Sequence, residues 1–178
     1  MNDQRCPGCG AATSVAPGPV HAYVPASPGC WSLFCSLTDW MQSLPGSDGS
    51  TIAQQVVDSY MVQHAANPDR RNRQSVAVHL MCLCASVEHQ RPGDELRSLL
   101  GNWTHRDYPE LLPRPLGFEI TVEQIVSAEG PERRVAVGAW ARSAWGAWAQ
   151  HHDIIRGWLA NSTGAAPRDG SRRMHPFP

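Results

Sequence analysis

A cysteine pair near the N-terminus is the most specific chemical signal in this chain. The run Cys6-Pro7-Gly8-Cys9-Gly10 has the Cys-Pro-x-Cys-Gly form of a zinc knuckle, a tight turn that aims two thiolates at one ion and needs glycine for its backbone. A redox-active pair is the alternative reading, but no βαβ pattern surrounds these cysteines. The pair therefore indicates a metal site.

Two further ligands are needed to close such a site. A zinc ribbon would supply them with a second Cys-x-x-Cys pair, which the chain lacks. His21 and Cys30 are the expected completions, with Cys35 as the substitute. We predict that Cys6, Cys9, His21 and Cys30 hold a structural zinc ion and tie the N-terminal segment to the first helix, because a closed tetrahedral shell leaves no position for substrate.

His79 lies on an expected buried helix that spans about residues 72–89. At about 100° per residue, the polar residues of this helix gather on one stripe. They are Ser75, His79, Cys82 and Ser86. The stripe has two readings: His79 is a metal ligand or a catalytic group, or it bonds to a neighbouring helix while the hydroxyls bond to the preceding turn.

Other histidines point inward from two more helices. His64 falls near the centre of an apolar arc, with Tyr60 one turn earlier, where its hydroxyl can reach a ligand or a metal-bound water. Asp58 falls roughly 120° away from His64 around the helix, so we expect it to bind an arginine or cap a loop. His151 and His152 flank the buried face of the last helix, and the geometry does not choose between them.

These interior histidines predict a second metal centre. His64, His79 and one of His151 and His152 can form a facial His₃ set with an open position, which catalytic zinc uses to acidify a water. Iron, nickel or copper also accept imidazole ligands. In this reading His79 and Tyr60 are the catalytic residues. A haem site is a weaker reading, because the chain has no Cys-x-x-Cys-His motif.

Composition excludes several other functions. All fifteen cationic side chains are arginine, so Schiff-base lysine chemistry and a P-loop lysine are absent. A formal net charge of -1 gives no general attraction to nucleic acid or to a membrane surface. The N-terminus lacks the apolar run of a signal peptide, and no stretch is long and apolar enough for a membrane span. We therefore expect a cytoplasmic protein with reduced or metal-bound cysteines and without a nucleic-acid or membrane partner. An unknown small-molecule ligand is the partner left open.

The elements that must position these residues are helices. Apolar periodicity between Pro/Gly breaks predicts helices over about 30–43, 51–66, 72–89, 94–101, 121–128 and 132–160. No convincing strand alternation is present. We expect an all-α helical bundle forming one domain, residues 1–160, in which residues 1–30 are a loop-rich cysteine-knuckle cap linked by zinc. The polar tail 161–178 is expected to be disordered.

The chain resembles a bacterial, mainly actinobacterial, domain family of unknown function. The resemblance rests on five stretches and covers most of residues 6–159. They are Cys6-Pro7-Gly8-Cys9-Gly10-Ala11, His21-Ala22-Tyr23 with Ser27-Pro28-Gly29-Cys30-Trp31, Val57-Asp58-Ser59-Tyr60 with Gln63-His64, Gln74-Ser75-Val76-Ala77-Val78-His79-Leu80, and Trp140-Ala141-Arg142-Ser143-Ala144-Trp145 with Trp148, His151 and His152. The family implies no activity.

A looser resemblance is to helical-bundle, metal-dependent enzymes of the DinB type, which place three histidines on bundle helices. Those proteins carry a His-x-x-x-His pair on the final helix, whereas this chain has adjacent His151 and His152, so the likeness concerns architecture only. The hypothesis from sequence is a metal-dependent enzyme with an interior histidine site. The alternative is a binding or sensor module in which zinc only stabilises the fold.

Overall fold

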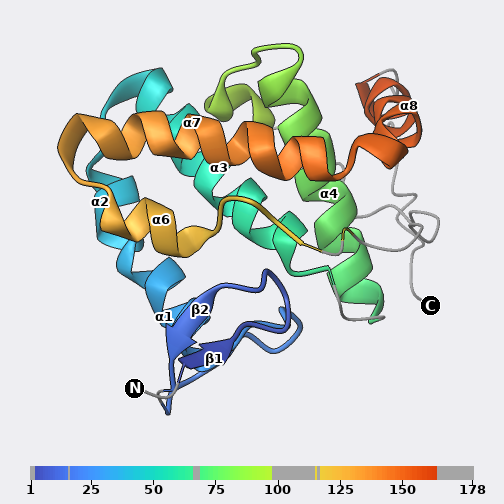
Figure 1. Ribbon diagram of the computed structural model, residues 1–178. Coiled ribbons are helices and arrows are strands. Elements are labelled where there is room, and N and C mark those ends of the chain that lie inside the picture. Colours follow the sequence, from blue (N-terminus) through green and yellow to red (C-terminus); the bar gives the residue numbers. More distant parts are fainter. Residues whose placement is uncertain (1–2, 16, 66–68, 98–114, 116, 164–178) are drawn as a thin grey trace, which may run out of the picture.

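Helices make up most of the chain that the computed structural model describes, which is residues 3–15, 17–65, 69–97, 115 and 117–163 (Figure 1). The prediction of an all-α bundle with a loop-rich N-terminus is confirmed. The helices are α1 (Pro28–Ser36), α2 (Thr38–Ser43), α3 (Gly46–Gln63), α4 (Arg70–Val87), α6 (Val122–Ser127), α7 (Gly130–Ala147) and α8 (His152–Thr163). Residues 93–97 are also helical.

The bundle is organised around α3, which packs on both α4 and α7, while α4 packs on α8. One apolar cluster, centred on Leu80, Leu83 and Trp148, lies among α4, α7 and α8. A second lies between the N-terminal segment, α1, α3 and α7, and includes Tyr60 and Trp140. No helix in the described part of the chain is both long and apolar enough to cross a membrane.

A small antiparallel sheet, which the sequence did not predict, begins the chain. Strand β1 (Asp3–Arg5) pairs with β2 (Ala12–Ser14), with Gln4 opposite Thr13. Both strands lie next to α1 at one edge of the molecule (Figure 1). Three residues are too few for a period-2 pattern to stand out in a sequence, so the intervening cysteine knuckle is the only signal of this hairpin.

Side-chain caps determine where several helices begin. The Ser27 hydroxyl accepts the backbone N–H of Cys30 and starts α1, while the Asp69 carboxylate accepts the N–H of Arg71 and starts α4. Thr121 forms a capping box with Gln124 at the start of α6. The predicted helix over 30–43 is divided at Leu37 into α1 and α2.

The predicted continuous helix over 132–160 is wrong, because the chain breaks after Trp148. A 3₁₀ turn, Ala149–His151, separates α7 from α8, and the two helices run in different directions in Figure 1. The Trp145 carbonyl accepts the N–H of Trp148 and lies 3.0 Å from His152 Nε2, which donates to it. Both bonds satisfy the Trp145 carbonyl, one of the last-turn carbonyls of α7 that the helix itself leaves without a partner.

The segment 164–178, which the sequence predicts to be disordered, lies outside the described residues. Helix α8 continues past the predicted boundary at residue 160 and ends at Thr163.

Candidate metal centre

Four buried ligand atoms meet between the N-terminal segment and the bundle. The thiols of Cys6, Cys9 and Cys30 and the imidazole of His64 lie within 4.8 Å of one another. His64 Nε2 is 3.4 Å from Cys6 Sγ and 3.6 Å from Cys30 Sγ. Cys9 Sγ is 3.7 Å from Cys30 Sγ. This Cys₃His cluster can hold a metal ion.

The spacing within the cluster matches a tetrahedral shell. Zn–S bonds of about 2.3 Å and a Zn–N bond of about 2.0–2.1 Å put neighbouring sulfurs about 3.8 Å apart and each sulfur about 3.6 Å from the nitrogen. Three of the six pairwise separations, at 3.4–3.7 Å, lie close to these values, and all six are within 4.8 Å. A disulfide would require about 2.05 Å between two sulfurs, and all three cysteines are free thiols.

The knuckle backbone places the first two sulfurs. Cys6 N–H donates to the Ala11 carbonyl, and Gly10 N–H donates to the Cys6 carbonyl, both at 2.9 Å. Gly10 takes φ +82°, a left-handed conformation that glycine adopts without strain. The Ser27 N–H points at Cys6 Sγ from 3.5 Å. The same residue caps α1, so the third sulfur, on Cys30, is placed in the first turn of that helix.

His64 supplies the fourth donor from the end of α3, where it is the C-cap residue. Its Nδ1 lies 2.6 Å from the Tyr60 carbonyl, to which the ring N–H donates. This bond selects the tautomer that leaves the Nε2 lone pair directed at the sulfurs. The ring is fully buried, and its bond to Tyr60 holds Nε2 toward Cys6 Sγ and Cys30 Sγ.

Tyr60, which the sequence analysis assigns to the interior histidine site, lies instead beside the Cys₃His cluster. Its hydroxyl lies 3.6 Å from Cys30 Sγ, and its ring stacks between Phe34 and His64. Burial, followed by the nearby Cys30 thiol, raises the pKa of Tyr60 well above its usual range. The phenol therefore stays protonated, and its O–H would be available to a Cys30 thiolate that binds an ion.

Without an ion, the three sulfurs compete for protons. Hydrogen bonds from Cys30 and Cys9 hold the pKa of Cys6 far below its ordinary value, whereas the neighbouring Cys6 and Cys9 sulfurs and burial raise the pKa of Cys30. Burial lowers the pKa of His64, but its bonds with Cys6 and Cys9 outweigh this and raise it to about 9. A divalent cation would neutralise such buried thiolates, and metal ligands bind in deprotonated form.

His21, the predicted fourth ligand, lies outside the cluster, and His64 stands in its place. The His21 ring packs edge-on against Tyr23, with centroids 4.3 Å apart, and lies 5.2 Å from Trp31. It is not among the four clustered residues. His64 occupies the remaining position because the end of α3 brings it against the knuckle. The substitute Cys35 is exposed, since it lies more than one turn beyond Cys30 in α1.

The predicted interior His₃ centre is not assembled. His64 faces the cysteines, while His79 Nδ1 lies 2.7 Å from Asp58 Oδ1. His151 is buried beside Trp148, and His152 stacks on Trp145 at 3.8 Å. Because the helix breaks after Trp148, His151 and His152 do not lie where a continuous helix would put them.

Asp58 was also misread from the sequence. It is fully buried, pairs with His79, and accepts the Gln54 Nε2–H at 2.8 Å. Burial raises its pKa, against the opposing effect of His79. The helical wheel put Asp58 away from His64, but α3 is covered by α4 as well as α7, so two of its faces are interior. The sequence carries a weak signal for this pair, because a carboxylate stands within an apolar run of one helix and a histidine stands on the next helix.

A second group of potential ligands occurs in the described residues, namely Cys84, Glu88 and His89. Glu88 is already engaged: it accepts from Arg156 and from Trp145 Nε1. The hydrogen bonds from Arg156 lower the pKa of Glu88 to about 2. This carboxylate therefore links α4 to α7 and α8, and the group is not a candidate metal centre.

Replacing Gly8 with alanine tests how closely the knuckle and His64 fit. A Cβ at Gly8 would overlap the His64 ring and lie 2.7 Å from the Pro25 carbonyl. We expect metal affinity to fall about 10- to 100-fold, the usual cost of displacing a ligand's supports. Competition with a chromophoric chelator measures it. At Gly18, a Cβ would make only an ordinary contact, 3.8 Å from Pro28 Cβ, so Gly18→Ala should keep the wild-type affinity. Equal metal affinities in Gly8→Ala and Gly18→Ala would contradict a close fit between the knuckle and the His64 ring.

A model of a family of unknown function, DUF5946, matches residues 4–149. No curated protein and no solved structure matches the chain. The matched region contains all four clustered donors together with Asp58 and His79, and it ends before His151.

Proposed function

The chain belongs to the DUF5946 family of unknown function, and from its candidate metal centre we propose that it is a zinc-binding protein whose ion links the N-terminal segment to the helical bundle. One observation carries the proposal. Three buried thiols and one imidazole nitrogen, preset in its tautomer, lie at the separations of a tetrahedral shell. Three thiolates with one imidazole form a donor set that favours zinc.

A structural role is favoured over a catalytic one. Three sulfurs and one nitrogen fill the four positions of a tetrahedral ion, and all four residues are buried. Catalytic zinc sites keep one position open for water or substrate. This arrangement supports the zinc-stabilised alternative among the sequence hypotheses rather than the metal-dependent enzyme.

The ion would connect three separate parts of the chain: the knuckle, α1 and the end of α3. The segment before α1 contains only two three-residue strands, and so small a sheet is marginal without further support. Metal-binding free energy at such a site is folding free energy. Because thiolate ligands must stay reduced, we also propose a cytoplasmic setting.

Elemental analysis of protein purified without added metal tests the proposal. We expect one zinc per chain, because the described residues offer one such closed shell. Exchange into cobalt(II) should give the intense visible bands of a tetrahedral, thiolate-bound ion.

Metal-free protein that is folded and does not take up zinc would overturn the proposal. An octahedral cobalt spectrum would do the same, because three thiolates and one imidazole cannot give it. Iron in place of zinc would refute the assignment of the metal while retaining the cluster as the site.

A further inference from the structure

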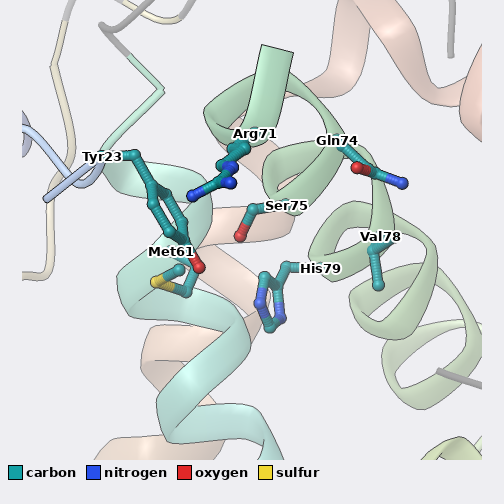
Figure 2. A pocket seen from close by; sticks show the side chains of 7 residues that line it. All are labelled: Tyr23, Met61, Arg71, Gln74, Ser75, Val78 and His79. Atoms are coloured by element: carbon teal, nitrogen blue, oxygen red, sulfur yellow. The ribbon is translucent and has the colours of Figure 1, made fainter. Parts of the chain in front are cut away.

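A pocket of about 450 Å³ opens between α3, α4 and the N-terminal segment, apart from the metal centre. None of its lining residues is one of the four clustered donors. Figure 2 shows Tyr23 and Met61 on one side, facing the polar groups of α4 across the opening. The lining residues are Tyr23, Met61, Arg71, Gln74, Ser75, Val78 and His79. Its volume is that of a site for a small organic molecule.

A buried carboxylate orients the histidine of this pocket. His79 Nδ1 is 2.7 Å from Asp58 Oδ1, and the histidine side chain is 14% exposed while the aspartate is fully buried. Within the described residues, no group hydrogen-bonds His79 Nε2, and Asp58 Oδ2 is buried without a partner. Because Nδ1 is engaged with Asp58, Nε2 is the ring atom that remains for a ligand.

A cationic group lies at the opposite end of the polar wall. Arg71 is held at the start of α4 by its backbone bond to Asp69, and its guanidinium extends over the opening toward Tyr23 (Figure 2). No residue in the described ranges pairs with this guanidinium. The Ser75 hydroxyl lies between Arg71 and His79 along α4 (Figure 2). Donors at i, i+4 and i+8 of one helix share a face.

The remaining wall is apolar and well anchored. Tyr23 and Met61 form this side, and Val78 adds an apolar group on α4, beyond His79 (Figure 2). Asn72 Nδ2 donates to the Tyr23 carbonyl at 2.9 Å and lies 3.0 Å from the His64 carbonyl. The Asn72 side chain therefore links the backbone at Tyr23 to the helical bundle.

We propose that this pocket binds a small organic acid. Its apolar body would lie against Tyr23, Met61 and Val78, and its acid group would bind the Arg71 guanidinium and His79 Nε2. Arginine is suited to such a group because it offers paired N–H donors to two oxygens.

An anion fits this lining better than a cation does. The described lining contains no carboxylate that could pair with a bound cation. Asp58 is not part of the lining: it is fully buried, with its Oδ1 bonded to His79 and Gln54. A His79 ring that carries both N–H groups would donate one to Asp58 and the other to an oxygen of the bound acid. The inference does not depend on which metal the Cys₃His cluster holds.

Nuclear magnetic resonance titration of the full-length, metal-loaded protein tests the proposal. The probes are benzoate, phenyl phosphate and the neutral benzamide, followed through the imidazole nitrogens of His79 and the backbone amide of Arg71. We expect one or both anions to shift these signals saturably, while benzamide leaves them unchanged. A larger effect of phenyl phosphate would identify a phosphate monoester as the acid, and a larger effect of benzoate a carboxylate.

The variants Arg71→Gln and Arg70→Gln remove the same charge from adjacent, exposed positions, but only Arg71 lines the pocket. Arg71→Gln should weaken binding about tenfold or more, the usual loss for a charged hydrogen bond, and Arg70→Gln less than about twofold. His79→Gln should also weaken binding while the metal content stays unchanged. Absence of saturable shifts with both anions would overturn the proposal. Equal losses in the two arginine variants, or equal binding of benzamide, would do so as well.

Discussion

Cys30→Ser is expected to release the bound metal and to lower the melting temperature by about 10–20 °C. Loss of a structural metal is among the few single changes that cost about 5 kcal/mol, and 1 kcal/mol corresponds to roughly 2–4 °C in a chain of this size. Cys30 is fully buried and its sulfur lies within 3.7 Å of Cys9 Sγ, His64 Nε2 and Tyr60 Oη. Calorimetry with elemental analysis measures both effects.

Cys35→Ser is the matched control, because Cys35 lies in the same helix and is exposed. We expect it to retain the metal and to change the melting temperature by about 1–2 °C at most. A chelator added to the wild-type protein should reproduce the Cys30→Ser melting curve, since both remove the ion. If Cys30→Ser keeps the wild-type metal content and melting temperature, Cys30 is not a ligand.

His64→Ala is expected to abolish stable metal binding, whereas His21→Ala should leave one ion bound. The two substitutions remove the same side chain from the two positions that compete for the fourth ligand. His64 Nε2 lies 3.4 Å from Cys6 Sγ, and the His21 ring contacts Tyr23 and Trp31 instead. The ratio of metal to protein after gel filtration distinguishes them.

His64→Ala should also lower the free energy of unfolding more than His21→Ala does. His64→Ala removes the metal and also leaves a cavity, because the ring is fully buried, so a loss of several kcal/mol, on the order of 4–5, is expected. His21→Ala removes aromatic contacts worth about 0.5–1.5 kcal/mol in addition to its buried area. Loss of metal in His21→Ala together with full retention in His64→Ala would show that the sequence prediction of the fourth ligand was correct.

Helix α3 carries both sites of this protein. Tyr60 and His64 face the cysteines, while Asp58, less than one turn before Tyr60, faces His79 on α4. Residues two apart on a helix point in different directions, so one helix serves two neighbouring interiors. A rigid α3 would place the pocket relative to the N-terminal segment, which supplies both Tyr23 to the pocket wall and Cys6 and Cys9 to the cluster.

The helical architecture was accessible from the sequence because its signals are local. Periodic apolar residues, the Thr121–Gln124 cap and the Pro/Gly breaks all act over a few residues. The division between α7 and α8 was not accessible. It depends on an imidazole bond from His152 to the Trp145 carbonyl and on ring stacking between the two residues, which a continuous helical pattern does not reveal.

The sequence by itself determined the first half of the metal centre. The Cys6–Cys9 knuckle is encoded by neighbouring Pro and Gly residues, and the buried Cys30 follows a local helix cap. Only the tertiary structure decided that His64, and not His21, completes the set, and that Asp58 pairs with His79. Both choices depend on which faces of α3 meet the N-terminal segment and α4. This packing brings together residues that are far apart in the sequence. It depends on the free energy of the whole folded chain, so the spacing between residues in the sequence does not specify it.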